Sequence, residues 1–307
     1  MCGILGQISN LTINQDLFTS DLLKLKHRGP DDYGTYFDNT IALGQTRLSI
    51  IDLSKKGHQP MISNCENYII IFNGEIYNFE EIRADLISKN YKFNSNTDTE
   101  VILNGYIEYK EQIVNKLNGM FAFSIYDKTN EELFLARDRS GIKPFFYYFK
   151  DNKFIFSSSI KSILNLLDYK PNLNKVALSK YMQYFVSYGE ETFYQGIFKL
   201  EASTYMVYEP KKAYELQKKK YYKINTYKSI KDEKLALNDI EELLIKSVEY
   251  RLNSDVEVAS LLSGGIDSSL LSALYTKISG KKINTFSIGY DEYKNYCELD
   301  FAKINAN

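Results

Sequence analysis

The chain opens with Met1-Cys2-Gly3-Ile4, the stretch around which we expect the first domain to be built. Removal of Met1 would place Cys2 at the N-terminus, so that one residue would carry both a thiol and a free α-amine. An α-amine has a pKa of about 7.7–8.0, and a good fraction of it is therefore unprotonated near neutral pH. Such an amine can act as the base for its own thiol. The start of the chain thus indicates an N-terminal nucleophile, although four residues do not identify one by themselves.

Length and composition suggest two globular domains and exclude several classes of partner. The chain has 307 residues, of which 44% are hydrophobic and 25% charged, and a domain usually takes about 150 residues. A net charge of -1 gives no reason to expect a nucleic acid or an anionic membrane as partner. No apolar run approaches the roughly 18 residues of a membrane span, and the start lacks the basic and apolar segments of a signal peptide. We therefore expect a cytoplasmic protein.

Cysteine and histidine are too sparse for several familiar kinds of site. The three cysteines, Cys2, Cys65 and Cys297, are far apart and odd in number, so they indicate neither a disulfide framework nor a zinc site. A Ser-His-Asp or histidine-rich metal mechanism would have to use His27 or His58, because the chain has no other histidine. This shortage favours a nucleophile that needs no histidine.

Apolar periodicity predicts a first region of strands and helices. The run YIIIFN at residues 68–73 is continuously apolar, which predicts a strand buried on both faces, and we expect this strand to break at Asn73-Gly74-Glu75. TDTE at 97–100 fits a capping box, with Asp98 in the positive first turn of a helix. The other expected strands are at 4–9, 33–37, 40–49, 119–127, 132–138, 145–149 and 153–156, and the other expected helices are at 16–27, 78–90, 159–167 and 174–186.

A second region follows a Lys- and Tyr-rich stretch at 209–234 that shows little periodicity and reads as a solvated connector. A strand, a glycine-rich loop, a helix and another strand occur there in this order. Strand, helix and strand in this order predict a parallel unit. The expected elements are a helix at 235–252, the strand VEVASLL at 256–262, the loop SGGIDSS at 263–269, a helix at 267–279 and the strand INTFSIG at 283–289.

The loop SGGIDSS has the composition of an anion-binding loop. Two glycines between a buried strand and a helix allow backbone N–H groups to converge on an anion at the helix N-terminus. Ser263, Ser268 and Ser269 add hydroxyl donors, and Asp267 could hold Mg²⁺ beside phosphates. The loop lacks the Lys of a Walker loop. The alternative is a tight turn with a Ser/Asp cap, and the spacing favours phosphate binding over it.

The motifs together resemble a known family. SGGIDSS resembles the pyrophosphate-binding loop of ATP pyrophosphatases, which adenylate a carboxylate, and MCGI resembles the start of class II (N-terminal nucleophile) glutamine amidotransferases. Between them, RGPDDYG, TRLSIIDL, FNGEIYN, TDTEVIL, GMFAFSIYD and ARDRSGIKP occur in the order seen in glutamine-hydrolysing asparagine synthetases. The resemblance implies an α+β N-terminal nucleophile fold, an αββα sandwich of antiparallel sheets, followed by an incomplete α/β parallel-sheet ATP pyrophosphatase domain. The implied bounds are 1–212 for the glutaminase domain, 213–234 for a connector and 235–307 for the ATP-binding domain.

The resemblance also implies a role for each matching residue of the first domain. Cys2 would attack the side-chain amide of glutamine, form a glutamyl thioester and release ammonia. The Asn73 side chain and the Gly74 backbone N–H would form the oxyanion hole, where charge develops on the carbonyl oxygen. The implied glutamine contacts are Arg47 on the α-carboxylate, Glu75 and Asp98 on the α-ammonium, Asn73, and Ile50 in the wall of the site.

Each of these residues also has a purely structural interpretation. Arg47 could be a surface residue at the end of a strand, Asp98 could be only a helix cap, and Asn-Gly is usually a turn. RGPD and ARDRSGIKP hold the fold as plausibly as they hold a ligand, and we leave them out of the catalytic set. In the second domain the implied ATP and pyrophosphate contacts are Leu262, Ser263, Gly264, Gly265, Asp267, Ser268 and Ile288, with Mg²⁺ at Asp267.

Three departures from the family pattern bear on function. Gln45 stands where a His commonly precedes RLSI, Ser159 replaces a usual Glu, and Glu201-Ala202 replace a usual Pro-Gly. The first indicates altered neighbours for Arg47, and the second concerns coupling between the two half-reactions. A family member would also continue past residue 307 with further strands and a later SGEGSDE-like motif. We therefore expect a truncated product, a split gene or an incomplete record, with a sheet left open.

The leading hypothesis is a glutamine-dependent asparagine synthetase that uses ATP, Mg²⁺, glutamine and aspartate, or a near relative that amidates another carboxylate. A stand-alone glutaminase is the second hypothesis. The third is a non-catalytic regulatory or binding subunit that a separately encoded partner completes. The expected assembly is a homodimer or a complex with a complementing synthetase fragment.

Overall fold

The computed structural model describes residues 1–150, 153–210, 216–224, 226, 232–290, 292 and 297–306. The chain divides into two compact units, Met1–Ile224 and Asn225–Asn307, and each is described by itself. Among the described residues, no helix is long and apolar enough to cross a membrane.

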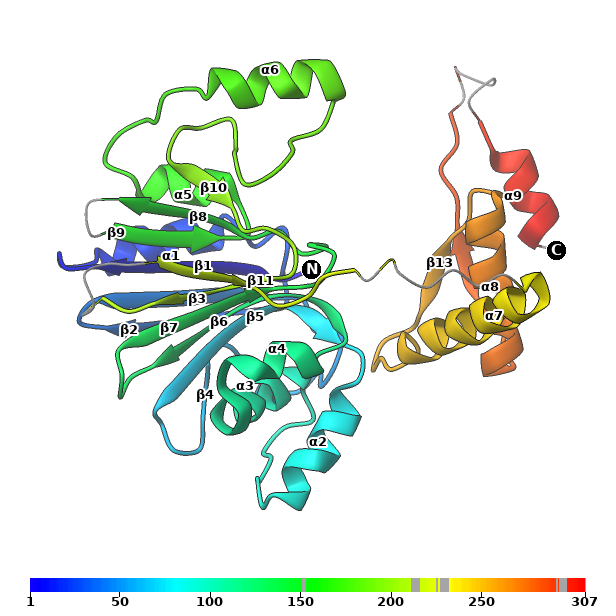
Figure 1. Cartoon of the computed structure of the whole chain (residues 1–307), viewed down its shortest axis with the longest axis horizontal. Coiled ribbons are helices and arrows are strands. Elements are labelled where there is room, and N and C mark those ends of the chain that lie inside the picture. The colour runs from blue at the N-terminus through cyan, green and yellow to red at the C-terminus, as the bar shows by residue number, and fades with distance from the viewer. Residues whose placement is uncertain are drawn as a thin grey trace. The chain divides into compact units, whose positions relative to one another are not determined.

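Unit 1 contains two six-stranded sheets in which every neighbouring pair of strands is antiparallel (Figure 1). Sheet 1 has the order β10 (Ile197–Lys199), β8 (Phe146–Lys150), β9 (Lys153–Ser157), β1 (Gly3–Ser9), β3 (Ile41–Arg47) and β2 (Asp32–Asp38). Sheet 2 has the order β12 (Leu216–Lys220), β11 (Thr204–Tyr208), β7 (Glu132–Arg137), β6 (Gly119–Asp127), β5 (Tyr68–Ile76) and β4 (Met61–Ile62).

Helices cover the outer faces of the two sheets. On sheet 1 these are α1 (Gln15–Leu23) and α5 (Ile160–Leu166), and on sheet 2 they are α2 (Phe79–Ser88), α3 (Asp98–Tyr109) and α4 (Ile113–Lys116). The remaining helical elements of the unit are α6 (Lys175–Tyr184) and the short 3-10 turns η1 (Lys55–Gly57) and η2 (Lys110–Gln112). The result is the αββα sandwich that the resemblance implied.

The core lies in three apolar layers that follow from the alternation of side chains along each strand. On β5, Ile69 and Ile71 pack between the two sheets, together with Ile4 of β1. Their neighbours Ile70 and Phe72 point the other way and pack under α2 and α3. Because successive side chains of a strand face opposite sides, this continuously apolar run is buried on both faces, which confirms the sequence-based expectation.

The expected break of this strand at Asn73-Gly74-Glu75 is wrong. β5 continues through Ile76, with Asn73 opposite Ala122 and Ile76 opposite Gly119 of β6. Asn-Gly is a turn pattern when it stands alone. Here β6 provides a full set of partners for the backbone of these residues, and pairing outweighs the local turn preference. The site residues of this motif therefore lie on a strand and not in a loop.

The first unit reaches Ile224, beyond the expected domain end at residue 212. The strand β12 pairs with β11 from Leu216 opposite Tyr208 to Lys220 opposite Thr204. Part of the stretch that reads as a solvated connector is thus an edge strand, and its lysines suit such an edge because charge discourages pairing with other chains. Residues 213–215, 225 and 227–231 of the expected connector lie outside the described residues.

Unit 2 contains the parallel unit that the sequence predicts. Strands β13 and β14 pair in parallel, with Ser260 opposite Thr285, and α8 connects them. The large apolar side chains of Leu261 and Phe286 are 74% and 63% exposed. The elements in order are α7 (Glu233–Tyr250), β13 (Ala259–Leu261), α8 (Ile266–Ser279), β14 (Asn284–Phe286) and α9 (Leu299–Ala306).

Candidate active site

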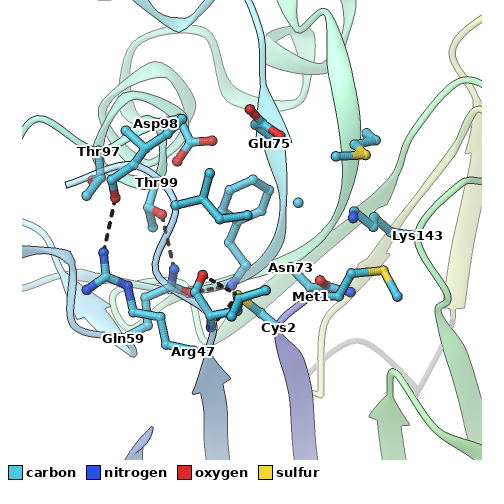
Figure 2. A pocket seen from close by; sticks show the side chains of 16 residues that line it. Met1, Cys2, Arg47, Gln59, Asn73, Glu75, Thr97, Asp98, Thr99 and Lys143 are labelled. Atoms are coloured by element: carbon cyan, nitrogen blue, oxygen red, sulfur yellow. Dashed lines mark hydrogen bonds between the residues drawn. The ribbon is translucent and has the colours of Figure 1, made fainter. Parts of the chain in front are cut away.

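One cavity of unit 1, about 180 Å³ in volume, brings together every residue that the sequence proposed for glutamine (Figure 2). These residues come from the start of β1, the end of β3 and the loop after it, the second half of β5, and the first turn of α3. The two sheets therefore contribute to one site. The proposed residues in its wall are Cys2, Arg47, Ile50, Asn73, Gly74, Glu75 and Asp98.

Cys2 lies at the edge of the cavity and contacts the loop after β3. The backbone N–H of Leu48 donates to its Sγ at 3.4 Å, and the Arg28 Nε donates to its carbonyl oxygen at 3.1 Å. Burial raises the pKa of the Cys2 thiol, while the Leu48 hydrogen bond acts in the opposite direction. In the chain as translated the free α-amine belongs to Met1, which also lines the cavity. An N-terminal nucleophile at Cys2 therefore requires removal of Met1.

Asn73 provides the clearest indication of a binding site. Its side chain is fully buried, yet within the described part of the chain neither its Oδ1 nor its Nδ2 has a hydrogen-bond partner. Buried polar atoms are nearly always paired, and an unpaired amide costs about 1–3 kcal/mol. A ligand atom that accepts from Nδ2 would satisfy the donor. This arrangement suits an oxyanion hole, which needs a donor held in place before charge develops.

Gly74 follows on the same strand, where the backbone is tightly enclosed. A Cβ at this position would lie 2.3 Å from the Met120 carbonyl oxygen and 2.7 Å from the Phe121 Cα. Only glycine therefore fits. Because there is no side chain, the backbone of residue 74 stays accessible from the cavity that it lines.

Arg47 is 6% exposed and is held by the loop that follows β3. Its Nη2 donates to the Ile51 and Asp52 carbonyl oxygens at 3.2 and 2.6 Å, and its Nη1 donates to the Ser54 carbonyl oxygen at 3.1 Å. A guanidinium has five N–H donors, so the loop leaves two of them for a carboxylate. Gly57 packs on the other side, where a Cβ would come within 1.9 Å of Nη2.

Glu75 and Asp98 place two carboxyl groups in the same cavity. The Ile76 N–H donates to the Asp98 Oδ2 at 2.9 Å, so the end of β5 fixes the side chain that begins α3. Burial, opposed by the Ile76 hydrogen bond and reinforced by the nearby charge of Glu75, raises the pKa of Asp98 to about 7. An ammonium group bound between the two carboxylates would remove this penalty.

The TDTE motif contains three side chains with different roles, those of Thr97, Asp98 and Glu100. The Thr97 side chain caps α3 by accepting from the Glu100 N–H at 3.2 Å. The Glu100 carboxylate accepts from the backbone N–H groups of Asn94 and Ser95, so it fastens the preceding loop and does not close the expected capping box. Asp98 is then free to face the cavity rather than serving as the cap.

Sequence reasoning missed several residues of this cavity. Lys143, from the ARDRSGIKP motif that we had left out of the catalytic set, lines it. Gln59 is buried and bridges two walls, since its Nε2 donates to the Thr99 Oγ1 at 3.1 Å and its Oε1 accepts from the Phe72 N–H at 2.7 Å. Arg28 of RGPD touches the Cys2 carbonyl. In the sequence, the only indication that these residues belong to the site was that their motifs lie among those that carry the named site residues.

Gln45, the departure from the family pattern, lies behind the site. It is fully buried and its Nε2 donates to the Phe72 carbonyl oxygen at 3.4 Å, next to Asn73 in the chain. Its Oε1 has no partner among the described residues. This hydrogen bond joins Gln45 to strand β5 and not to the guanidinium of Arg47. The expectation of altered neighbours for Arg47 therefore stays a prediction.

The glycine-rich loop of unit 2 sits between β13 and α8. Gly264 has a φ of +87°, and a Cβ there would come within 2.5 Å of the Phe301 Cβ. The Ser263 and Ser268 hydroxyls lie 3.1 Å apart, and the Ser268 Oγ accepts from the Ser263 N–H at 3.3 Å. Gly265 is the N-cap of α8 without a side-chain cap, so the first turn keeps N–H groups available for an anion.

Only some of the proposed nucleotide contacts line the same cavity. A cavity of about 340 Å³ is lined by Leu262, Ser263 and Ile288 among others. Gly264, Gly265, Asp267 and Ser268 are in the adjoining loop and first helical turn but are not in its wall. Asp267 is exposed, and the described residues contain no group of three or more His, Cys, Asp or Glu side chains suited to a metal. A single carboxylate fits Mg²⁺ only where phosphates supply further ligands.

Comparison with family models agrees with the two units. A model described as a glutamine amidotransferase domain matches residues 1–222, and one described as asparagine synthase matches residues 239–307. The putative asparagine synthetase [glutamine-hydrolyzing] 2 of Methanocaldococcus jannaschii is 38% identical over 99% of this chain and 62% of its own length. The asparagine synthetase [glutamine-hydrolyzing] 1 of Bacillus subtilis is 36% identical over 100% of this chain and 48% of its own length. The chain thus spans about half to three fifths of these relatives.

Comparison with solved structures concerns the fold alone. A glutamine phosphoribosylpyrophosphate amidotransferase from B. subtilis aligns with a TM-score of 0.54 and 17% identity, over 94% of this chain and 67% of that chain. This likeness confirms the expected N-terminal nucleophile fold. Because the amidotransferase model covers most of the chain and contains the whole cavity around Cys2, this chain belongs to the glutamine amidotransferase family and joins that domain to a segment of the asparagine synthase family.

Proposed function

We propose that unit 1 hydrolyses glutamine to glutamate and ammonia at Cys2, and that the ammonia amidates an ATP-activated aspartate in a cytoplasmic asparagine synthetase. The observation that carries the first half is the buried, unpaired amide of Asn73 in one cavity with Cys2, Arg47 and Asp98. The second half is supported by the asparagine synthase match at residues 239–307 and by the names of the relatives.

Binding of glutamine would use three charged groups in the wall of the cavity. The Glu75 and Asp98 carboxylates would receive the α-ammonium, and the remaining N–H donors of Arg47 would receive the α-carboxylate. These contacts would place the side-chain amide toward Cys2 at the other end of the cavity. Fixing both ends of the substrate in this way brings the reacting atoms together and lowers the entropic part of the barrier.

Chemistry would then proceed in two steps once Met1 is removed. The Cys2 α-amine takes the thiol proton, the sulfur attacks the amide carbon, and the Asn73 Nδ2 and Gly74 N–H stabilise the negative oxygen. The intermediate collapses with the proton passing to the departing nitrogen, which leaves as ammonia, and a thioester remains. Water, losing a proton to the amine, attacks the thioester and releases glutamate and the free thiol.

For the synthetase half, the loop from Ser263 to Ser268 would hold the phosphates of ATP at the N-terminus of α8, with Asp267 reaching a phosphate-bound Mg²⁺. The uncapped first turn and the left-handed Gly264 support this assignment. Ile288 and Leu262 would contact the base. When bound, ATP supplies the adenylate that activates the acceptor carboxylate.

The test is a pair of assays on the purified chain with a Cys2→Ala variant. Mass spectrometry of the N-terminus establishes removal of Met1, and glutamate formation from glutamine measures the first half-reaction. We expect activity that Cys2→Ala abolishes and that the control Cys65→Ala, which removes an exposed cysteine of the same unit, leaves intact. Absence of glutaminase activity in a folded, Met1-free chain would reject the proposal in favour of a non-catalytic subunit.

The second assay supplies ATP, Mg²⁺, aspartate and ammonium, and measures asparagine and AMP. Their formation would support asparagine synthesis. Glutamine hydrolysis without any asparagine would instead indicate a stand-alone glutaminase. AMP formation with another carboxylate in place of aspartate would identify a different acceptor. Size-exclusion chromatography distinguishes a homodimer from a chain that needs a separate synthetase fragment.

A further inference from the structure

Lys143 is a buried cation without a direct partner. It is 5% exposed and lines the cavity together with Met1, Cys2 and Glu75. In the part of the chain that the structure describes, its ammonium makes no hydrogen bond and no ion pair. Figure 2 shows its amino group directed toward the cavity. Burying an unpaired charge is unfavourable for folding, and its presence at this place therefore requires an explanation.

Hydrogen bonds hold the backbone of Lys143, whose side chain lines the cavity. The Asp138 Oδ2 accepts from the Lys143 N–H at 3.0 Å, and the Arg137 Nε donates to the Lys143 carbonyl oxygen at 2.7 Å. Asp138 also accepts from the N–H groups of Ser140 and Ile142. The Asp138 side chain therefore ties together the turn after β7, and this turn carries the lysine that lines the cavity.

Among the nearby charges, that of Cys2 has the largest effect on the pKa of Lys143. Burial lowers the pKa of Lys143, and the interaction with Cys2 is the largest of the charge effects that raise it. The charges of Lys143 and Arg28 also lower the pKa of the α-amine of the chain. The ionisable groups that face this corner of the cavity are Met1, Cys2, Arg28, Asp31, Arg47, Glu75, Asp98, Asp138 and Lys143.

In the mature chain the thiol and the α-amine of Cys2 would titrate as a coupled pair. The reactive form of the pair carries one proton fewer than the resting acid form. Its charge is lower by one whether the proton leaves the sulfur or the nitrogen, and a nearby cation favours that loss in both cases. Arg28 is engaged with the Cys2 carbonyl. Arg47, whose charge also lowers the pKa of the Cys2 thiol, is engaged with the carbonyl groups of its loop. Among the described residues that line the cavity, Lys143 is therefore the cation whose charged group has no such contact.

We propose that the buried ammonium of Lys143 favours loss of a proton from the Cys2 thiol and α-amine pair, and so makes the nucleophile active at neutral pH. This inference rests on the proposed glutaminase function. Lys143 would act through its charge on Cys2, and no proton or other group would pass through Lys143 itself.

The test compares Lys143→Met with the wild type in the glutaminase assay as a function of pH. The rising, acidic limb of kcat/KM should move upward by about one pH unit, which corresponds to about a tenfold loss of rate on that limb. The rate of Cys2 alkylation by iodoacetamide should show the same displacement, and it does not depend on glutamine. Lys143→Arg, which keeps the charge, should restore the limb at least in part, and the surface control Lys161→Met should leave it in place.

The melting temperature separates this role from a structural one, because loss of a structural residue should lower it. Replacing an unpaired buried ammonium by an apolar side chain of similar length should leave the melting temperature unchanged or raise it. The proposal would be overturned if the acidic limb moved neither in the glutaminase assay nor in the alkylation assay, whether or not the melting temperature fell. If Lys143→Met does not fold, Lys143→Gln carries the same test, and failure of both to fold would show that the fold itself needs the cation. An inactive wild-type chain would instead reject the proposed function.

Discussion

The substitution Asp98→Asn should make unit 1 more stable at high pH while weakening its binding of glutamine. Burial, reinforced by the charge of Glu75, raises the pKa of the Asp98 carboxyl from 3.8 to about 7. Between these two pH values the carboxyl is ionised in the unfolded chain and protonated in the folded one, so folding takes up a proton. Stability therefore falls as pH rises from about 4 to about 7, and Asn, which does not titrate, removes this loss.

The magnitude follows from the size of the shift. A shift of about three units corresponds to at most about 4 kcal/mol, because one unit is about 1.4 kcal/mol. Of this, about 2.5 kcal/mol develops between pH 5 and pH 8. The Ile76 N–H that donates to the carboxylate can donate equally to the side-chain oxygen of Asn. The variant should thus keep this hydrogen bond and lose only the charge.

The assay is urea unfolding of both proteins at pH 5 and pH 8, followed by far-ultraviolet circular dichroism because the chain contains no Trp. The stability advantage of Asp98→Asn should be larger at pH 8 by about 2 kcal/mol or more. The control Asp16→Asn changes an exposed carboxyl on α1 and should show no such trend. An advantage that is equal at the two pH values would refute the assignment of a protonated, unbalanced carboxyl in the empty site.

Glutamine provides the second half of this test. The α-ammonium of glutamine favours the ionised carboxylate, so binding to the wild type should tighten as pH rises through 7, and the KM for glutamine should fall. In Asp98→Asn the KM should be higher and nearly independent of pH in this range. Measuring stabilisation by glutamine in a Cys2→Ala background separates binding from turnover.

Two further substitutions test the remaining parts of the cavity. Asn73→Ala should lower kcat/KM about 10²–10³-fold, as expected for loss of an oxyanion donor. The free energy of unfolding should not fall, because the substitution removes a buried amide that has no hydrogen-bond partner among the described residues; a large loss of stability would contradict this. Gly57→Ala would place a Cβ 1.9 Å from the Arg47 Nη2 and push the guanidinium from its carbonyl cradle, so the KM for glutamine should rise roughly tenfold with little change in kcat, whereas an unchanged KM would argue that Arg47 does not hold the substrate.

The sequence predicted the fold well where burial alone decides it. The continuously apolar run of β5 and the periodic helices were recognised because packing between two layers demands apolar side chains at regular positions. Ile69 and Ile70 illustrate this, since adjacent residues fill different layers of the core. The end of β5 could not be predicted in the same way, because the pairing of Asn73 with Ala122 depends on a strand some fifty residues later.

The same distinction holds for the site. Cys2, Arg47 and Asp98 could be proposed because each sits in a motif with a recognisable chemical role. Lys143 could not, because its motif ARDRSGIKP holds the fold as plausibly as it holds a ligand, and only the three-dimensional structure shows that this lysine lines the cavity. The edge strand β12 was missed for a related reason. Its run of lysines suggests a solvated linker, and its place in the sheet depends on the backbone of β11.

Three groups in the wall of the cavity describe the ligand more closely than the motifs do. Asp98 has its pKa raised by burial and by a neighbouring carboxylate, Asn73 has an amide without a partner, and Arg47 keeps two donors after its loop contacts. Each is unfavourable or incomplete in the absence of a ligand. A cation for the first, a carbonyl oxygen for the second and an anion for the third are all present in a free α-amino acid with a side-chain amide. The proposed preference for glutamine as a free amino acid, and not as part of a peptide, follows because a peptide would supply neither of the two end charges.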